Sequence, residues 1–377
     1  MTSTAGTAGT VDVVVVGGGA MGSAAAWQLA RQRVQVVLLE RFAAGHTNGA
    51  SHGASRIFRL SYPDPVHIGL AREAGRLWRE LEQHTGTRLL TVTGGVDHGD
   101  HPYLDELADG LAAAGVPHHW LTPQEATERW PGIRFDTRAL FHPDSGRLHA
   151  DRSVAALQAA AEKSGAVVLH STPVTAIEVL SENAVLVHTD NGSYRARRVV
   201  VAVNAWASKL LGGLAPLPPL RVTQEQPAHF AARESEDGWP SLGHRFAEGS
   251  AAAGAFFGGI YGLATPGQGI KIGFHGVGPE VDPDHRDFTP EPAQLAALRE
   301  YARQWLPGVD ADVLVPISCT YTTTPDSNFV LDRHGPVVVA TGFSGHGFKF
   351  APAIGRVLAD LAISGTRPDR RFAFARR

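Results

Sequence analysis

The hydrophobic pattern at the start of the chain predicts a strand, a tight turn, a helix and a second strand. Residues 11–16, VDVVVV, form a short and mostly apolar run, as expected for a strand that is buried on both faces. A Gly-rich turn and a helix-forming stretch over 23–33 follow, and residues 34–40, VQVVLLE, predict the second strand. Together these segments predict a compact βαβ unit.

Similar patterns return later in the chain. Residues 66–86 carry apolar side chains at helical spacing, and residues 166–211 predict strands, with the Asn191-Gly192 pair as a hairpin turn. Residues 336–365 predict a buried strand, a Gly-rich loop and a terminal helix. No internal repeat or low-complexity segment is present, so neither a solenoid nor a long linker is indicated.

Two segments, 88–147 and 216–324, have a different character, because they mix short β-prone runs with Pro/Gly turns. We therefore predict a discontinuous nucleotide-binding domain over 1–87, 148–215 and 325–377. The two segments between these parts would form a second domain, which binds the substrate.

Composition excludes several classes of protein. With 34 basic and 37 acidic residues the net charge is −3, so no nucleic-acid footprint is present. No apolar run approaches the roughly 20 residues of a membrane helix, and the small, polar start MTSTAGTAGT lacks the features of a secretion signal. We therefore expect a cytoplasmic protein. One cysteine excludes an intramolecular disulfide, and no histidines and acids stand at metal-ligand spacing, so we expect no metal site.

The first turn carries a dinucleotide-binding pattern. Gly17-x-Gly19-x-x-Gly22 lies between a predicted strand and a predicted helix, where glycines permit a tight turn and close approach to a pyrophosphate. Glu40, at the end of the second strand, is placed to accept hydrogen bonds from ribose hydroxyls, and we include its neighbour Arg41 in the cofactor site. The alternative is a Gly-rich turn without a ligand, and this pattern alone does not choose between NAD and FAD.

The C-terminal part of the chain favours FAD. Residues 337–350, VVVATGFSGHGFKF, resemble the flavin loop of FAD-dependent amine and amino-acid oxidases. In that loop Gly342, Gly345 and Gly347 would let the backbone approach the isoalloxazine ring. An NAD enzyme has no need of a second Gly-rich strand–helix unit so far along the chain.

Nearly the whole chain resembles the monomeric sarcosine oxidase family, which includes N-methyltryptophan oxidase and pipecolate oxidase. The motifs HTNGASHGASRIFR, KIGFH, SCTYTTTPDSNFVLDRH and GFSGHGFKF occur in the order and spacing of that family. The resemblance implies an α/β fold: an FAD-binding, Rossmann-type domain like that of glutathione reductase, interleaved with an α+β substrate domain that contains an antiparallel sheet.

The resemblance gives Cys319 a role. It implies FAD as the cofactor and a thioether between Cys319 and the 8-methyl carbon of the flavin. From the residues alone, a lone cysteine is more simply explained as a small buried hydrophobe. A thiol in a polar Ser/Thr-rich stretch is nevertheless a reasonable nucleophile.

The resemblance assigns Arg59 and Lys349 to the carboxylate of an amino-acid substrate, which cations bind well. Lys349 is one of only four lysines and lies between two phenylalanines. The simpler alternatives are a surface ion pair for Arg59 and, for Lys349, a side chain that reaches solvent from a helix start.

A third cation, Lys271, matches the family lysine that activates dioxygen, since a fixed positive charge stabilises the negative charge that oxygen acquires. From its strand pattern alone, Lys271 would be a solvent-facing lysine. Arg56, His52 and Ser55 are expected near the flavin. Three residues match those that line the family's substrate cavity: Tyr261, His275 and Tyr321.

We therefore predict a flavin-dependent oxidase of secondary amino acids that oxidises a C–N bond to an imine and reduces dioxygen to hydrogen peroxide. Sarcosine, another N-methyl amino acid and a cyclic imino acid such as pipecolate or proline all remain open as substrates. The rivals are a dehydrogenase that uses another electron acceptor, a flavin-binding module without catalysis and an NAD-dependent enzyme. We expect a monomer whose partners are the amino acid and dioxygen.

Overall fold

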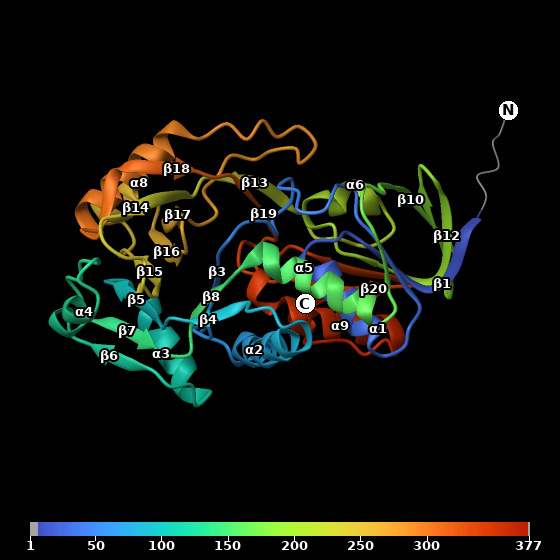
Figure 1. Ribbon diagram of the computed structural model, residues 1–377, viewed down its shortest axis with the longest axis horizontal. Helices are drawn as coiled ribbons and strands as arrows, with labels where there is room; N and C mark the ends of the chain where they lie inside the picture. Colours follow the sequence, from blue (N-terminus) through green and yellow to red (C-terminus); the bar gives the residue numbers. More distant parts are fainter. Residues whose placement is uncertain (1–6, 376–377) are drawn as a thin grey trace.

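The computed structural model describes residues 7–375, which form two large sheets (Figure 1). The strands of one sheet lie at one end of the long axis of the molecule, and those of the other sheet lie at the opposite end. The polar start, on which the expectation of no secretion signal rests, falls mostly outside the described residues. None of the helices within 7–375 is both long and apolar enough to span a membrane.

Within the described residues the first sheet has eight strands, in the order β10-β11-β12-β1-β2-β9, with β21 beside β12 and β20 beside β21. The pairs of β1 with β2 and β12, of β2 with β9 and of β12 with β21 are parallel. The strands are β1 (Thr7–Val16), β2 (Val36–Leu39), β9 (Val167–Leu169), β10 (Val174–Ser181), β11 (Ala184–Thr189), β12 (Gly192–Val201), β20 (Val330–His334) and β21 (Val337–Thr341).

Helices cover one face of this sheet (Figure 1). They are α1 (Ala20–Ala30), α5 (Ala150–Lys163) and α9 (Ala351–Ile363), and α2 (Pro65–Thr85) packs against α5 and α9. Every residue of α1 is buried, which explains its run of alanines. A side chain at Gly355 of α9 would come within 2.5 Å of the backbone of Ala24, so this glycine lets α1 and α9 pack closely.

The second sheet has the order β18-β14-β17-β16-β15-β5-β7-β6 within residues 7–375. All neighbouring strands are antiparallel except β5 and β15. Helix α8 (Pro292–Trp305) packs against it around an apolar core. The strands are β5 (Gly95–Gly99), β6 (His119–Leu121), β7 (Ala139–His142), β14 (Ala228–Ala232), β15 (Ser241–Arg245), β16 (Gly259–Thr265), β17 (Gly269–Phe274) and β18 (Val309–Pro316).

Two small sheets join these parts. The pair β13 (Arg221–Glu225) and β19 (Cys319–Thr323) carries the cysteine, and β3 (Arg56–Phe58) pairs with β8 (Gly146–Leu148), which also pairs with β4 (Leu90–Val92). The remaining helices are α3 (Tyr103–Ala113), α4 (Pro123–Arg129), α6 (Ala207–Leu211), α7 (Ala251–Ala255), η1 (Asn204–Trp206), η2 (Phe348–Phe350) and η3 (Arg370–Phe372). The predicted fold class, a Rossmann-type α/β part interleaved with an antiparallel α+β part, is confirmed.

The core of the second sheet holds two stacked histidines. His98 of β5 and His244 of β15 are register partners, and their ring centroids lie 3.8 Å apart. Neither ring nitrogen of His98 has a hydrogen-bond partner in the described part of the chain. Burial lowers the pKa of His98 to about 3, and it also lowers the pKa of His244 below its ordinary value.

These histidines predict acid sensitivity. The unfolded chain takes up protons near pH 6.5 whereas the folded chain stays neutral, so stability falls as the pH drops below 6.5. Each such histidine lowers the free energy of unfolding by about 2 kcal/mol between pH 7 and pH 5. We expect His98→Leu to reduce the fall in the free energy of unfolding between pH 7 and pH 5 by about 2 kcal/mol, as measured by urea unfolding at both pH values. The exposed His285→Gln should change nothing, and an unaltered pH dependence in His98→Leu would contradict this explanation.

Candidate active site

The Gly-rich turn connects β1 to α1 and needs its glycines for backbone reasons. Gly17 has a φ of +102°, a conformation that L side chains rarely adopt, and a Cβ there would lie 2.7 Å from the carbonyl oxygen of Ala202. A Cβ at Gly22 would overlap the carbonyl oxygen of Gly17. These two positions therefore fix the turn and the close packing of α1 behind it.

The first turn of α1 points its backbone N–H groups toward the same turn. Gly19 is the N-cap residue and provides no side-chain cap. Ser51, from the loop before β3, places its hydroxyl oxygen 3.0 Å from the N–H of Ala20. Because helix N-termini attract anions, this end of α1 suits a phosphate group.

Glu40 lies at the end of β2, where its buried carboxylate is held by backbone N–H groups. Gly18 N–H donates to Oε2 at 2.6 Å, and Phe42 N–H donates to Oε1 at 2.9 Å. The neighbouring Arg41 turns toward the surface and forms an ion pair with Asp284 at 2.6 Å. Glu40 is thus fixed beside the turn, and Arg41 links this region to the loop after β17.

A cavity of about 610 Å³ extends along these elements, within the size range of ligand sites. It is lined by ten of the predicted residues: Gly17, Gly19, Glu40, Arg41, His52, Arg56, Cys319, Tyr321, Gly345 and Gly347. Ser55 does not line it, because its hydroxyl is buried against Thr265, with the two oxygens 2.6 Å apart. Ser55 therefore ties the loop before β3 to the second sheet.

Cys319 begins β19 and faces this cavity, half-buried. The guanidinium of Arg56 approaches it, with Nη2 4.0 Å from Sγ. Arg286 braces the same segment, donating to the Ser318 hydroxyl at 2.8 Å and to the Asn48 carbonyl at 2.9 Å. The cysteine is thus a thiol at a cavity wall beside positive charge, and not a packed core residue.

Lys271 lies on β17 and is 5% exposed. Its neighbours Ile270 and Ile272 point into the core of the second sheet, so Lys271 faces the opposite way. Its side chain makes no hydrogen bond or ion pair with the described residues. Burial, and then the charge of Arg56, lowers the pKa of Lys271 to about 7.

Two histidines accompany this lysine. His229 is its register partner on β14, and burial followed by the charge of Lys271 lowers the pKa of His229 to about 4. Burial, followed by Arg56 and Lys271, lowers the pKa of His52 to about 3. Both imidazoles are therefore neutral near pH 7, and the positive charge in this region comes from Lys271 and the arginines.

Arg59 and Lys349 form a second group of basic side chains. Arg59 lies 3.5 Å from Asp97, and Lys349 donates to the hydroxyl of Tyr62 at 2.8 Å. Burial alone would raise the pKa of Asp97, but the hydrogen bond from His142 and the charge of Arg59 lower it to about 2. Asp97 is shared with His142 at 2.8 Å, and burial, followed by the charge of Arg59, lowers the pKa of Lys349 well below its ordinary value. An anionic ligand beside Lys349 would favour its charged form.

Three aromatic side chains lie beside these basic groups. The rings of His275 and Tyr321 have centroids 5.1 Å apart, and the Tyr321 and Tyr261 side chains interact with each other. Burial, and then the charge of Arg59, lowers the pKa of His275 to about 4, so it is neutral. Gly345 has no side chain that would overlap the Tyr321 ring, which explains the glycine there.

The loop after β21 depends on two further predicted glycines. Gly342 has a φ of +68°, and a Cβ at Gly347 would lie 2.7 Å from the Phe343 side chain. Gly347 lines the cavity and Gly342 does not, so Gly342 shapes the loop from behind.

The sequence comparisons agree with this geometry. Residues 12–361 match the family described as FAD dependent oxidoreductase (DAO). The chain is 36% identical to a monomeric sarcosine oxidase from Bacillus sp. (strain NS-129), over 94% of this chain and 93% of that protein. It is 30% identical to an N-methyl-L-tryptophan oxidase from Citrobacter koseri, over 93% of this chain and 94% of the relative.

The protein belongs to the FAD-dependent oxidoreductase family. The resemblance to monomeric sarcosine oxidases is confirmed, since the identity exceeds 30% over almost the whole chain. Among solved structures, the open form of NikD, an unusual amino acid oxidase essential for nikkomycin biosynthesis, superposes with a TM-score of 0.85. It is 29% identical and covers 97% of both chains.

The cavity fits the family's cofactor, FAD. Polar side-chain atoms that are buried without a hydrogen-bond partner in the described residues belong to six residues of its wall: His46, His52, His170, Asn204, Thr320 and Thr322. Such atoms are costly unless a ligand or water satisfies them. The turn at Gly17 and the N-terminus of α1 would hold the pyrophosphate, and Glu40 would hold the ribose.

Sequence patterns did not reveal several residues of this FAD site. Asn204 and Trp206 of η1 line the cavity, and Trp206 donates to Asp284 at 2.8 Å. Arg286 lies beside Cys319, while Tyr62 contacts Lys349. None of these residues belongs to a glycine or charge pattern, and only the left-handed backbone of Asn204, with a φ of 44°, marks a special position. Among residues 7–375, no group of three or more histidines, cysteines or acids could hold a metal ion.

Proposed function

We propose that the protein is an FAD-dependent oxidase of secondary amino acids, with sarcosine or another N-methyl amino acid as substrate. Bound FAD would accept two electrons from a C–N bond and pass them to dioxygen, which yields hydrogen peroxide and an imine that hydrolyses. The names of the relatives, monomeric sarcosine oxidase and N-methyl-L-tryptophan oxidase, support this substrate class.

One observation carries the proposal: the half-buried guanidinium of Arg59 and the buried amine of Lys349 both lie over the Tyr62 ring, and only Arg59 has a carboxylate partner, Asp97, among the described residues. A substrate carboxylate would give Lys349 an acidic partner, and charge-assisted hydrogen bonds to it would be strong in a buried site. Tyr321 joins this region to the FAD cavity, because it both lines the cavity and contacts the His275 ring. The substrate would therefore be held by its carboxylate, with its amine among the neutral aromatic side chains.

Lys271 and Cys319 do not belong to the proposed carboxylate site, and they would serve the oxidase reaction in other ways. We infer that Lys271 stabilises the negative charge that dioxygen acquires, since it is buried and has no partner that would neutralise it. We infer that Cys319 forms a covalent thioether with FAD, which its position on the cavity wall supports. We also propose that the protein is a monomer, that it is cytoplasmic and that its domains have the boundaries predicted from the sequence.

A substrate panel tests the function. The purified protein is assayed for hydrogen peroxide with sarcosine, larger N-methyl amino acids, pipecolate, proline and the primary amino acid glycine. We expect turnover with at least one secondary amino acid, rising with pH as the substrate amine loses its proton. Turnover of cyclic imino acids alone would shift the assignment to a pipecolate or proline oxidase. Reduction of an artificial electron acceptor without peroxide would indicate a dehydrogenase.

The carboxylate assignment predicts the effect of Arg59→Met. Losing a buried, charge-assisted contact costs about 2–5 kcal/mol, so we expect KM for the preferred amino acid to rise by about 10²-fold or more. The absorbance of bound flavin should not change, since Arg59 does not line the FAD cavity. Arg72→Met, which removes an exposed arginine of α2, is the control. An unaltered KM in Arg59→Met would exclude Arg59 from substrate binding.

A further inference from the structure

Arg245, the last residue of β15, is a half-buried arginine without an acidic partner. Leu242 of the same strand belongs to the core of the second sheet, so Gly243 and Arg245 face away from that core. The side chain of Arg245 makes no hydrogen bond or ion pair with the described residues. Its guanidinium carbon lies over the Tyr103 ring, 4.4 Å from the ring centroid. Its N–H groups are therefore free to bind a ligand.

The face of the sheet that carries Arg245 also carries the acid of the proposed carboxylate site. Gly243 is the register partner of Asp97 on β5, and a Cβ at Gly243 would lie 2.1 Å from Oδ1 of Asp97. Burial and then the charges of Arg59 and Arg245 lower the pKa of His275, and the charge of Arg59 acts on Arg245 as well. Arg245 therefore adds a positive charge beside the proposed carboxylate site.

Asp97 is already engaged by other groups. Its Oδ2 accepts from the Ser61 hydroxyl at 3.2 Å and lies 2.8 Å from Nε2 of His142, while Oδ1 faces Arg59. The charges of Arg59 and Arg245 both act on this carboxylate, which is ionised with a pKa of about 2. Because an arginine side chain keeps its charge in proteins, one carboxylate serves two guanidinium groups here.

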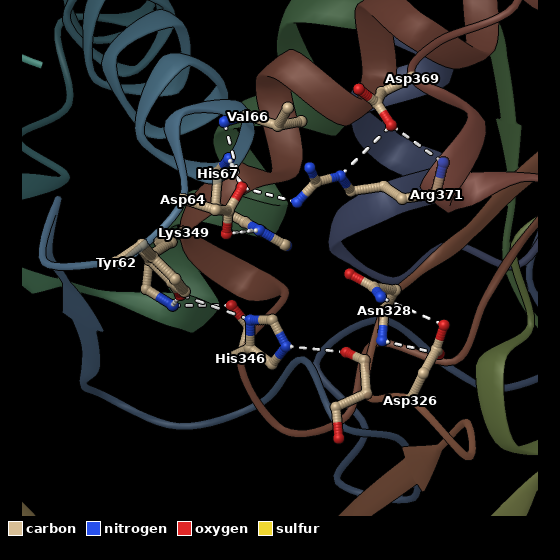
Figure 2. A network of polar contacts seen from close by, with 11 residues as sticks. Tyr62, Asp64, Val66, His67, Asp326, Asn328, His346, Lys349, Asp369 and Arg371 are labelled. Carbon is tan, nitrogen blue, oxygen red and sulfur yellow. Dashed lines mark hydrogen bonds and ion pairs between the residues drawn. The ribbon is translucent and has the colours of Figure 1, made fainter. Parts of the chain in front are cut away.

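Asp64, a second acid beside the proposed carboxylate site, is also engaged. It caps α2, pairs with Arg371 at 2.7 Å and lies 2.7 Å from Nδ1 of His67 (Figure 2). In the same view Lys349 donates to the Tyr62 hydroxyl at 2.8 Å. No carboxylate of residues 7–375 pairs with Lys349. The described part of the chain thus leaves two basic side chains of this region without an acid of their own.

We propose that the preferred substrate is a secondary amino acid with two carboxylates, and that Arg245 binds the second of them. Arg59 and Lys349 would hold the carboxylate next to the amine. The guanidinium of Arg245 would present parallel N–H donors to the carboxylate at the other end of the molecule. The Tyr103 ring would steady this guanidinium without occupying its N–H groups. The proposal rests on the proposed function, because it requires the first carboxylate to bind at Arg59 and Lys349.

Ligands without an amine test this site without turnover. Glutarate and succinate, each with two carboxylates, are compared with their monoamides, in which a neutral amide replaces one carboxylate. Each is titrated into the FAD-loaded protein by calorimetry. We expect at least one diacid to bind about 10- to 10²-fold more tightly than its monoamide, the usual effect of one charge-assisted contact.

Variants of Arg245 separate a binding role from packing on Tyr103. Arg245→Met should bind diacid and monoamide equally and keep the parent's affinity for the monoamide, whereas Arg245→Lys should retain part of the preference. Packing alone predicts that Arg245→Met weakens both ligands by the same factor. Arg299→Met, which removes an exposed arginine of α8, is the control and should match the parent. Flavin absorbance shows that each variant is folded and loaded.

Turnover then locates the second carboxylate in the substrate. N-methyl-L-glutamate is compared with N-methyl-L-glutamine, and iminodiacetate with its monoamide, by kcat/KM for peroxide formation. We expect a dicarboxylate to exceed its amide by about 10-fold or more, mainly through KM, and Arg245→Met to remove that preference. A preference for N-methyl-L-glutamate would place the second carboxylate on the side chain, and one for iminodiacetate would place it on the N-substituent.

The outcomes separate this inference from the proposed oxidase. Equal binding of diacids and monoamides by the parent protein, which needs no variant, would overturn the second carboxylate site and leave the oxidase standing. An unaltered preference in Arg245→Met would do the same. Preferential binding of diacids by a protein that oxidises no secondary amino acid would overturn the oxidase and keep Arg245 as a carboxylate-binding residue. Absence of any carboxylate binding would overturn both.

Discussion

Lys271→Met is expected to slow the reoxidation of reduced flavin by dioxygen by about 10²- to 10³-fold, the usual cost of losing one preorganised charge. Methionine keeps the length of the buried side chain but removes its charge. Because Lys271 has no partner among the described residues, its charge is available to oxygen as oxygen becomes negative. Reduction of the flavin by the amino acid should keep its rate, since Arg59 and Lys349 are untouched.

Stopped-flow absorbance measures both half-reactions separately. The comparison is made at pH 6.5, below the pKa of Lys271 of about 7, where the lysine is mostly charged. Lys163→Met, which removes an exposed lysine at the end of α5, is the matched control and should leave both rates unchanged. Equal slowing of the two half-reactions would point to structural damage, and unchanged reoxidation would remove Lys271 from the oxygen reaction.

Cys319→Ser is expected to abolish covalent flavin attachment. After acid precipitation the parent protein should retain its yellow colour in the pellet, whereas the variant should release nearly all of its flavin to the supernatant. The chain has one cysteine, so the thiol count is unambiguous. The denatured parent should show no free thiol and a mass increased by that of FAD, while apoprotein should show one thiol.

The control for this experiment is Thr323→Ser, at the other end of β19, which should retain the flavin as the parent does. The position of Cys319 explains the expectation, because the sulfur lies on the cavity wall beside Arg56. A colourless pellet from the parent, together with one titratable thiol, would show that Cys319 carries no flavin.

Local patterns predicted the elements around the dinucleotide turn because those elements depend on near neighbours. The apolar run at 11–16, the helix and the second strand appear as β1, α1 and β2. The organisation of β12 could not be predicted in this way. This one strand pairs with β1 along its length, with β11 over its first half and with β21 at its end, and such long-range pairing leaves no local signal.

The sequence pointed to candidate site residues where the residue type has few other structural roles. Position 17 has a positive φ, which explains its glycine. Lys271 became a candidate through the family resemblance, because its strand pattern alone predicts a solvent-facing lysine. Arg286 and Tyr62 were missed because their roles arise from contacts with residues distant in the chain, Ser318 and Lys349. No strand was predicted around residues 56–58, yet Arg56–Phe58 forms β3, which pairs with β8. Three residues are too short for a periodic signal.

The most direct measurement mixes the purified protein with sarcosine in the absence of oxygen. We expect the flavin absorbance to bleach, and admission of air to restore it with one hydrogen peroxide formed per flavin. N-methyl amino acids and pipecolate are tested in the same way if sarcosine is a poor substrate. A flavin that none of these secondary amino acids bleaches would contradict the assignment of an amino-acid oxidase.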